Sequence, residues 1–310
     1  KHFIAKNYGK WGVSKFDGDW VVMAEYDSLY SYSQFYVGSK GAATYILDSE
    51  GKTLHAIPFK TKPDRYLMLV SGERVGAITS AGHYIHPQYE EISVHGSFYE
   101  MKDSLGATLV HEGGRRVIKA EDEIEDVLGY SERYFHIIKD GKHGFVDENG
   151  KLRVANRYDS AQYYSEGLAP VKLLGKWGFI DKYEVLQIQP FYRYSSTFKN
   201  DLAIIQTGED FGIITPTGKE VVEVSWKYIQ RLKTDNYKII DWDGKVGICD
   251  VNGRFIVRPN YSAVEDTDKE LLIVTQNGKK GIIDYRGYSK LPFEYNDIQI
   301  KGEYLLLNKN

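Results

Sequence analysis

The sequence predicts an all-β protein built from about nine tandem copies of one small antiparallel sheet. The first observation is a glycine-centred motif that recurs about every 34 residues. The second is a series of short apolar runs rich in β-branched and aromatic residues, which are typical of strands. The third is the composition. The chain has 25 tyrosines and 30 glycines, which suit strands joined by tight turns because aromatic rings favour a pleated surface and glycine permits a positive φ.

The repeat is clearest at residues 141–151, where Gly-Lys-His-Gly-Phe-Val-Asp is followed three residues later by Gly150. The motif returns at 175–181 and 244–250. We call the glycine that ends the Gly-Lys-x-Gly motif, such as Gly144, the anchor. The anchors are Gly12, Gly76, Gly144, Gly178, Gly212, Gly247 and Gly281, with Tyr45 and Thr108 in the two gaps. Another glycine follows six residues after each anchor, except that Glu184 takes its place in one repeat. This spacing predicts a single repeat array over residues 1–310.

Each segment of the repeat has a physical interpretation. The apolar run before the anchor is a strand, the Gly-Lys step is a hairpin turn, and the anchor lies in the next strand. A glycine inside a strand indicates a bulge or a close backbone approach. The Asp-x-x-Gly sequence that follows is typical of a type I turn. A last strand ends at an aromatic residue that we expect to be a buried wedge between repeats. The aromatic positions are Tyr26, Phe59, Tyr89, Tyr158, Tyr192, Trp226, Tyr261 and Tyr295.

The arrangement of the repeats follows from their size. A sheet of three or four short strands cannot bury both faces alone, so neighbouring sheets must stack. We expect a β-propeller-like ring or spiral, and an open superhelical β-solenoid is the alternative. The repeat near residues 98–133 is the most irregular one and could host a special site. The acidic stretch 121–126 within it is interpreted as an exposed edge or loop.

Two segments carry a family resemblance. Gly9-Lys10-Trp11-Gly12 and Gly175-Lys176-Trp177-Gly178, each followed by an apolar pair and a turn, resemble the bacterial WG-containing (KWG) repeat family. The tryptophan of this motif is kept only at Trp11 and Trp177. The resemblance implies an all-β repeat architecture without an assigned activity. It also implies a bacterial protein, and many members of the family are exported or tethered to a membrane.

Composition and charge limit the functional classes. A net charge of −3 and a pI near 6.3 argue against nucleic-acid binding. Cys249 is the only cysteine, so no disulfide can form within the chain, and we expect it to be buried and inert. No apolar run approaches the ~20 residues of a transmembrane helix. The chain starts at Lys1 without a methionine or a leader, so we expect an exported protein of the periplasm or cell surface, with the cytoplasm as the alternative.

The sequence shows no arrangement typical of catalysis. His83 and His86 are three residues apart and would point to opposite faces of a strand, so we expect no metal site there. The Asp-x-x-Gly turns lack the alternating carboxylates of calcium loops. No nucleophile elbow, phosphate loop or dinucleotide motif is present, so neither a cofactor nor catalytic residues are expected. A carbohydrate-active hydrolase remains the enzymatic alternative.

The basic residues before the anchors are the weak candidates for ligand binding. These are Lys10, Lys142, Lys176, Lys245 and Lys279, and in a stacked array they would line up along one edge. Such a row could protect sheet edges and keep the protein in solution, or it could bind an anion. Trp20 and Trp242 are candidates for stacking on a sugar. We expect a non-catalytic scaffold for a protein partner, within a cell-envelope complex, and the alternative is a carbohydrate- or anionic-glycan-binding module.

Overall fold

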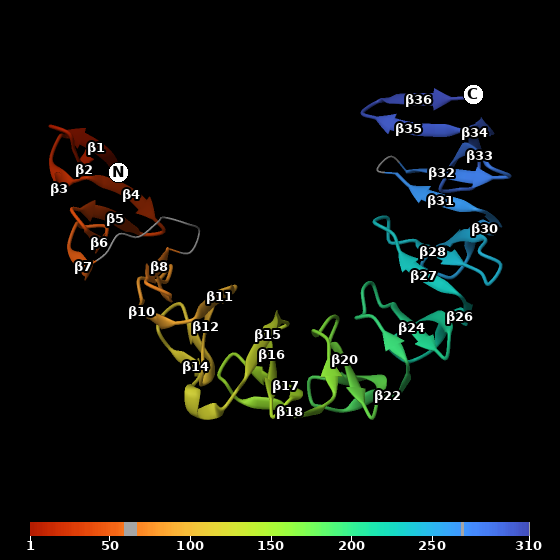
Figure 1. Cartoon of the computed structure of the whole chain (residues 1–310), viewed down its shortest axis with the longest axis horizontal. Helices are drawn as coiled ribbons and strands as arrows, with labels where there is room; N and C mark the ends of the chain where they lie inside the picture. Colours follow the sequence, from red (N-terminus) through yellow and green to blue (C-terminus); the bar gives the residue numbers. More distant parts are fainter. Residues whose placement is uncertain (59–66, 268–269, 310) are drawn as a thin grey trace. The chain divides into compact units, whose positions relative to one another are not determined.

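The computed structural model describes residues 1–58, 67–267 and 270–309 and confirms the all-β fold. Its 36 strands form ten small sheets, and every described strand pairing is antiparallel (Figure 1). The chain divides into two compact units, residues 1–141 with 145–152 and residues 142–144 with 153–310. The single array over 1–310 and the choice between ring and superhelix stay predictions.

The N-terminal unit contains sheets whose strands follow one another in chain order. The first is three-stranded, with β1 (His2–Asn7), β2 (Lys10–Lys15) and β3 (Trp20–Tyr26). The second has β4 (Ser28–Tyr32), β5 (Phe35–Lys40), β6 (Ala43–Leu47) and β7 (Thr53–Ile57). The third has β8 (Met68–Ser71), β9 (Arg74–Ile78) and β10 (Tyr84–Tyr89). The fourth has β11 (Glu91–His95), β12 (Phe98–Asp103), β13 (Gly106–His111) and β14 (Arg116–Ile118). The next sheet has β15 (Asp126–Ser131), β16 (Tyr134–Lys139), β17 (Lys142–Asp147) and β18 (Leu152–Tyr158), of which residues 142–144 and 153–158 are assigned to the C-terminal unit.

The C-terminal unit repeats the same order. Its sheets have β19 (Ser160–Ala161), β20 (Leu168–Leu173), β21 (Lys176–Asp181) and β22 (Leu186–Tyr192), then β23 (Tyr194–Ser195), β24 (Ala203–Thr207), β25 (Asp210–Ile214) and β26 (Glu220–Trp226). They continue with β27 (Tyr228–Arg231), β28 (Tyr237–Ile240), β29 (Val246–Cys249) and β30 (Phe255–Tyr261), then β31 (Ala263–Asp266), β32 (Leu271–Gln276), β33 (Lys279–Asp284) and β34 (Ser289–Tyr295). A two-stranded sheet has β35 (Asp297–Lys301) and β36 (Tyr304–Asn308).

The anchor glycine lies in the last strand but one of its sheet, and the last strand bulges towards it. In the sheet β19–β22, Trp177 pairs with Tyr192 but Phe179 pairs with Ile188, so the register shifts on either side of Gly178. A Cβ atom on Gly178 would lie 2.6 Å from the Ile188 carbonyl oxygen. The expected bulge and the expected close approach are therefore both confirmed.

One of the two repeats without an anchor glycine shows what the glycine is for. Tyr45 occupies that position on β6 and pairs with Ala56, and its neighbour Thr44 pairs with Ile57 without a shift. The fourth strand, β7, thus passes the large side chain without a bulge there, and its register shifts only between Ile46 and Leu47. The glycine permits the bulge of the fourth strand, and a sheet can form without it.

The Asp-x-x-Gly turns form as expected. At Asp147 the side chain accepts hydrogen bonds from the N–H groups of Asn149 and Lys151 at 2.8 and 3.0 Å, and Gly150 closes the turn with a φ of 77°. Glu184 adopts the same left-handed conformation with a φ of 64°. Its carboxylate reaches back to the preceding repeat, where it accepts a hydrogen bond from Tyr158 at 3.3 Å. Glu184, which replaces the glycine of this turn, therefore links two repeats.

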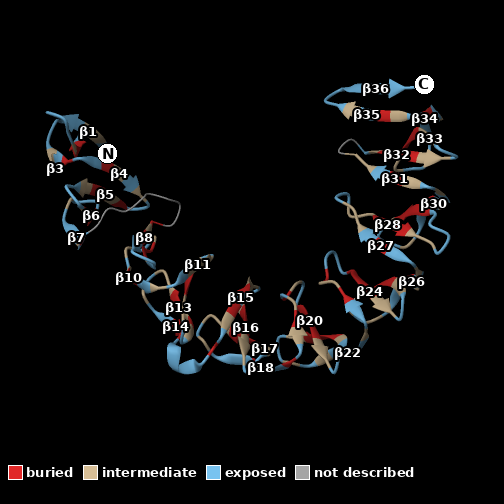
Figure 2. Ribbon diagram, in the orientation of Figure 1, coloured by how far each residue is buried: buried red, intermediate tan, exposed pale blue. Residues whose placement is uncertain are grey.

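The core consists of clusters between successive sheets, and buried residues recur from sheet to sheet (Figure 2). One cluster joins Phe179 and Ile188 of one sheet to Phe198 and Ile205 of the next. Stacking, as predicted from the small size of each sheet, therefore removes the apolar faces from water.

The aromatic wedge prediction is confirmed in part. Tyr26, Tyr158 and Tyr295 are buried, whereas Tyr192 and Tyr261 are only half-buried against their clusters. Phe59 lies outside the described residues. The acidic stretch is exposed except at Ile124, which is buried, and at Asp126, which is half-buried at the start of β15. It overlaps a 3₁₀ turn, Ala120–Asp122, the one helical element in the described part of the chain. It follows that no described helix is long and apolar enough to cross a membrane.

Candidate binding site

The position before the anchor connects adjacent repeats. Phe211 on β25 contacts Tyr194 of its own sheet and Tyr228 of the next, with ring centroids 6.2 and 5.9 Å apart. Lys280 occupies the same position on β33 and forms ion pairs with Glu265 and Asp297, at 3.3 and 3.0 Å. At this position, ring contacts in one repeat and ion pairs in another both connect a sheet to the next sheet. The motif tryptophan can therefore be replaced by residues that make the same connection in a different way.

Two lysines of the predicted cationic row are paired with carboxylates. Lys10 binds Asp27, and Lys142 binds Asp159 at 2.7 Å. The hydrogen bond from Lys142 holds the pKa of the Asp159 carboxyl below its usual value. Asp159 also accepts a hydrogen bond at 3.2 Å from the N–H of Gly175, in the following hairpin turn. The lysine, the aspartate and the next turn therefore hold successive repeats in register.

The other candidates each have different surroundings. Lys279 donates to the Asn296 side chain at 2.6 Å, while Lys176 and Lys245 are exposed. Trp20 is half-buried, and its ring covers Gly12. Trp242 is 50% exposed and donates through Nε1 to Asp210 at 2.9 Å. Ligand binding by these residues stays a prediction.

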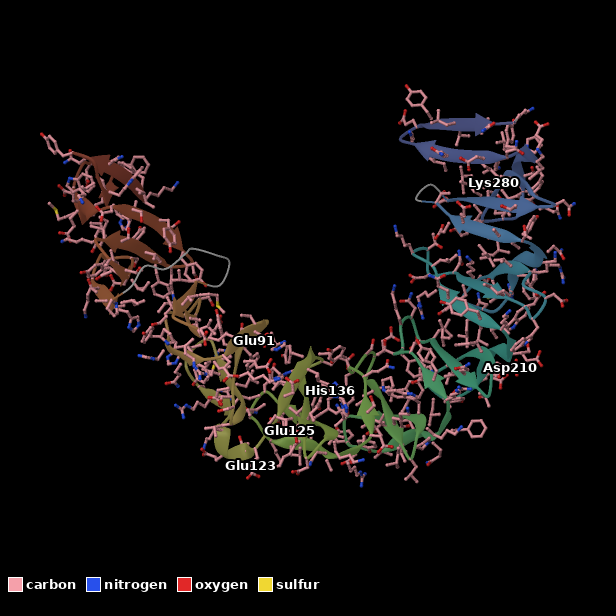
Figure 3. The ribbon with its side chains drawn as sticks, in the orientation of Figure 1. Glu91, Glu123, Glu125, His136, Asp210 and Lys280 are labelled. Carbon is pink, nitrogen blue, oxygen red and sulfur yellow. The ribbon has the colours of Figure 1, made fainter. Side chains whose placement is uncertain are left out.

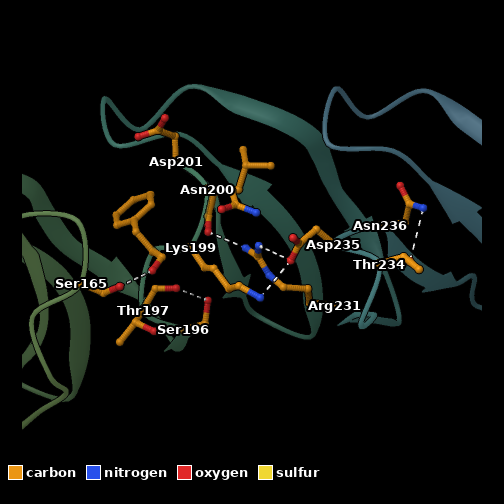
Figure 4. A network of polar contacts seen from close by, with 12 residues as sticks. Ser165, Ser196, Thr197, Lys199, Asn200, Asp201, Arg231, Thr234, Asp235 and Asn236 are labelled. Carbon is orange, nitrogen blue, oxygen red and sulfur yellow. Dashed lines mark hydrogen bonds and ion pairs between the residues drawn. The ribbon is translucent and has the colours of Figure 1, made fainter. Parts of the chain in front are cut away.

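A second polar feature lies in the turns between first and second strands of the C-terminal unit (Figure 4). Ser165 donates to the Phe198 carbonyl at 2.6 Å, and Arg231 donates to the Leu202 carbonyl at 2.9 Å. Lys199 forms an ion pair with Asp235 at 2.9 Å. These contacts join each turn to the next. We interpret this network as a structural connection between repeats.

A polar cavity lies within the N-terminal unit, between the first two strands of the β11–β14 sheet and the following strand β15. Its volume is about 300 Å³. It lies in the repeat that the sequence marked as irregular, and Glu91, at the start of β11, is labelled in Figure 3. The lining residues are Glu91, Ser93, His95, Glu100, Lys102, Asp126, Val127 and Leu128.

Glu100 is the buried charged group of this cavity. Only 7% of its side chain is exposed. One carboxylate oxygen lies 2.8 Å from His95 Nε2, and the other accepts the N–H of Val127 on β15 at 3.2 Å. The carboxylate therefore links the sheet to the next strand while lining the cavity.

Glu100 stands where most repeats have an apolar residue. It pairs with Leu109, the residue after the anchor position. The residues in the same register elsewhere are Ile4, Val37, Met68, Pro170, Ile204, Lys238 and Ile273. Placing a carboxylate in such a position costs free energy because the charge loses water. A local departure from the repeat pattern at a stability cost is typical of a functional site.

The rest of the lining adds charge. Lys102 forms an ion pair with Asp126 at 3.0 Å, and this contact raises the pKa of the Lys102 ammonium. Glu91 lies opposite Lys102 across the β11–β12 ladder. No group of three or more His, Cys, Asp or Glu side chains in the described ranges is arranged to hold a metal ion. The cavity is therefore an acidic polar site without a formed metal centre.

The sequence indicated the irregular repeat and the acidic stretch that ends at Asp126, but it assigned none of the cavity residues to a binding site. A signal was available, since Glu100 lies eight residues before Thr108 and the corresponding positions of most repeats are apolar. The partners on β11 and β15 could not be found in this way. Their proximity depends on how the sheets stack.

The comparisons with known proteins support the repeat family. The model of the WG containing repeat matches residues 144–177 and 247–279. These two segments therefore match the WG containing repeat, as the sequence indicated. No curated protein matches the sequence.

Solved structures resemble the chain only loosely. A eukaryotic initiation factor has 10% identity and a TM-score of 0.42, over 99% of this chain and 96% of that one. BamB from Moraxella catarrhalis has 14% identity and a TM-score of 0.31, over 88% and 93%. PorZ, described as a bacterial surface component of the type-IX secretion system of Porphyromonas gingivalis, has 12% identity and a TM-score of 0.30, over 97% and 52%.

Proposed function

We propose that this protein of WG-containing repeats is a non-catalytic binding protein that presents its repeat surface to a protein partner. The observation that carries the proposal is the polar cavity between β11, β12 and β15. A buried Glu100 at a position that is apolar in most repeats lowers stability, and a binding role accounts for its presence. The all-β repeat fold is compatible with a binding or scaffold role.

The geometry of the cavity favours binding over catalysis. Ser93, His95 and Glu100 are the residue types of a hydrolytic triad. Within the described residues, however, the Ser93 hydroxyl makes no hydrogen bond to His95, whose Nε2 is engaged by Glu100 at 2.8 Å. A serine nucleophile needs a base within hydrogen-bond reach. We therefore propose that the cavity binds a partner and does not catalyse a reaction. As a separate part of the proposal, the protein is exported to the bacterial cell envelope.

The proposal is tested by measuring how the purified chain binds a partner that has been identified in an envelope extract. The partner should bind the purified chain at a fixed stoichiometry, and Glu100→Gln should weaken binding at least about tenfold. Glu50→Gln, at an exposed turn of the same unit, removes the same charge and should leave binding unchanged. The absence of a stoichiometric partner, or a turnover reaction abolished by Ser93→Ala, would overturn the proposal.

A neutral-glycan site is the second candidate, and the observation that favours it is Trp242. Half of this side chain is exposed, and its indole is fixed by Asp210 at 2.9 Å. An immobilised aromatic plane beside a carboxylate suits stacking and hydrogen bonding to a sugar. The glycan site would be supported if the chain binds on a glycan array and Trp242→Ala abolishes this binding. The absence of binding to both neutral and acidic glycans would refute the glycan site.

A further inference from the structure

We infer that the cavity between β11, β12 and β15 receives an arginine side chain of the protein partner. This inference rests on the proposed function and names the chemistry of the group that is recognised. It is carried by the charge, the size and the apolar wall of the cavity.

The charge of the lining is unbalanced. Three carboxylates, those of Glu91, Glu100 and Asp126, share the cavity with the single ammonium of Lys102. The Lys102–Asp126 ion pair offsets one carboxylate, and Glu100 lies against His95, so the lining holds more carboxylates than cationic groups whichever charge His95 carries. Because of this excess of negative charge, a cation that enters the cavity gains a favourable electrostatic interaction. The cavity therefore selects for positive charge.

Glu100 retains acceptor capacity for such a cation. An ionised carboxylate offers about four lone-pair sites, and two are used by His95 and by the Val127 N–H, at 2.8 and 3.2 Å. A guanidinium suits a carboxylate with one free acceptor site on each oxygen, because its planar fork donates two parallel hydrogen bonds. A lysine ammonium would supply charge without this match.

The size and the apolar wall favour one side chain. At about 300 Å³ the cavity is at the lower limit of ligand pockets, which are typically ~300–1,000 Å³. An oligosaccharide would not fit within this volume. Val127 and the partly exposed Leu128 give the methylene stem of an arginine an apolar surface. Arginine is also among the residues that contribute most to protein interfaces.

Nuclear magnetic resonance titration of the full chain tests the inference without the partner. The probes are Nα-acetyl-arginine methylamide and its neutral analogue Nα-acetyl-citrulline methylamide. The Val127 amide is the reporter because it is hydrogen-bonded to Glu100. We expect the arginine probe to shift this resonance saturably and the citrulline probe to bind at least about tenfold more weakly. The lysine analogue should fall between them.

Glu100→Gln keeps an acceptor for the Val127 N–H and removes the charge, so affinity for the arginine probe should fall at least about tenfold. Glu50→Gln is the control and should change nothing. The amide spectrum away from the cavity verifies that each variant is folded. If Glu100→Gln misfolds, Glu91→Gln at the first residue of β11 gives the same test.

The outcomes separate the two proposals. Equal binding of the arginine and citrulline probes, or unchanged affinity in the charge-removal variant, overturns the arginine site even when a partner still binds the chain. Selective arginine binding with no stoichiometric partner supports the site and overturns the proposed function.

Discussion

Gly178→Ala tests the assignment of the anchor glycine to a close approach between strands. Gly178 does not have a positive φ, so alanine is conformationally acceptable there. The obstacle is steric, since the new Cβ would lie 2.6 Å from the Ile188 carbonyl oxygen and 2.7 Å from Pro190 N. Ordinary contact begins at 3.4 Å, so the strands would have to separate by about 0.8 Å. Both obstructing atoms belong to the backbone and cannot rotate away.

Overpacking a well-packed site costs about 1–3 kcal/mol, and we expect Gly178→Ala to lie near 3 kcal/mol because the backbone must move. Gly175→Ala is the matched control in the same hairpin. Gly175 has a φ of 77° and open space around its Cβ position, so alanine there should cost only about 1 kcal/mol of conformational strain.

Hydrogen exchange measures the two effects locally, as repeat arrays open unit by unit. At about 1.4 kcal/mol per factor of ten, amide protection in β21 and β22 should fall about 150-fold for Gly178→Ala. For Gly175→Ala the loss should be about fivefold. Equal losses, or the larger loss at Gly175, would refute the assignment of the anchor glycine to a close backbone approach.

Three further predictions concern single groups. Burial raises the pKa of the Cys249 thiol to about 12, so a thiol reagent at pH 8 should label it only on unfolding, and rapid labelling of the native protein would contradict its burial. Hydrogen bonds from Tyr130 and Arg133 hold the pKa of Glu148 below its ordinary 4.5, so its stabilising contribution is present above that pH and is lost as the pH falls through the lower folded-state value. Glu148→Gln should therefore flatten the acid dependence of the denaturation midpoint, and an unchanged slope would refute this. Lys142→Ala removes an ion pair whose lysine side chain is 45% exposed and should cost no more than about 0.5 kcal/mol in chemical denaturation, whereas a loss above 2 kcal/mol would show a larger structural role.

Local patterns explain why much of the fold was predictable. The strand before Gly178, its hairpin turn and the turn at Asp147 each depend on residues close in sequence, and each was predicted with its physical reason. The stacking of sheets was also predictable, because a small sheet exposes apolar faces that must be covered. The burial of each wedge was not, since Tyr158 is buried and Tyr261 is only half-buried. The packing of the adjoining sheet decides how far each ring is covered.

The sequence by itself determined the all-β repeat, its turns, its resemblance to the WG containing repeat and the location of its irregular unit, because these depend on spacing along the chain. Only the tertiary structure decided which side chains meet. Lys142 is paired with Asp159, seventeen residues away, and the carboxylate of Glu100 meets the Val127 N–H of the next sheet's first strand. The physical reason is that sheet stacking sets these contacts between repeats, and the position of one sheet against the next depends on every side chain packed between them.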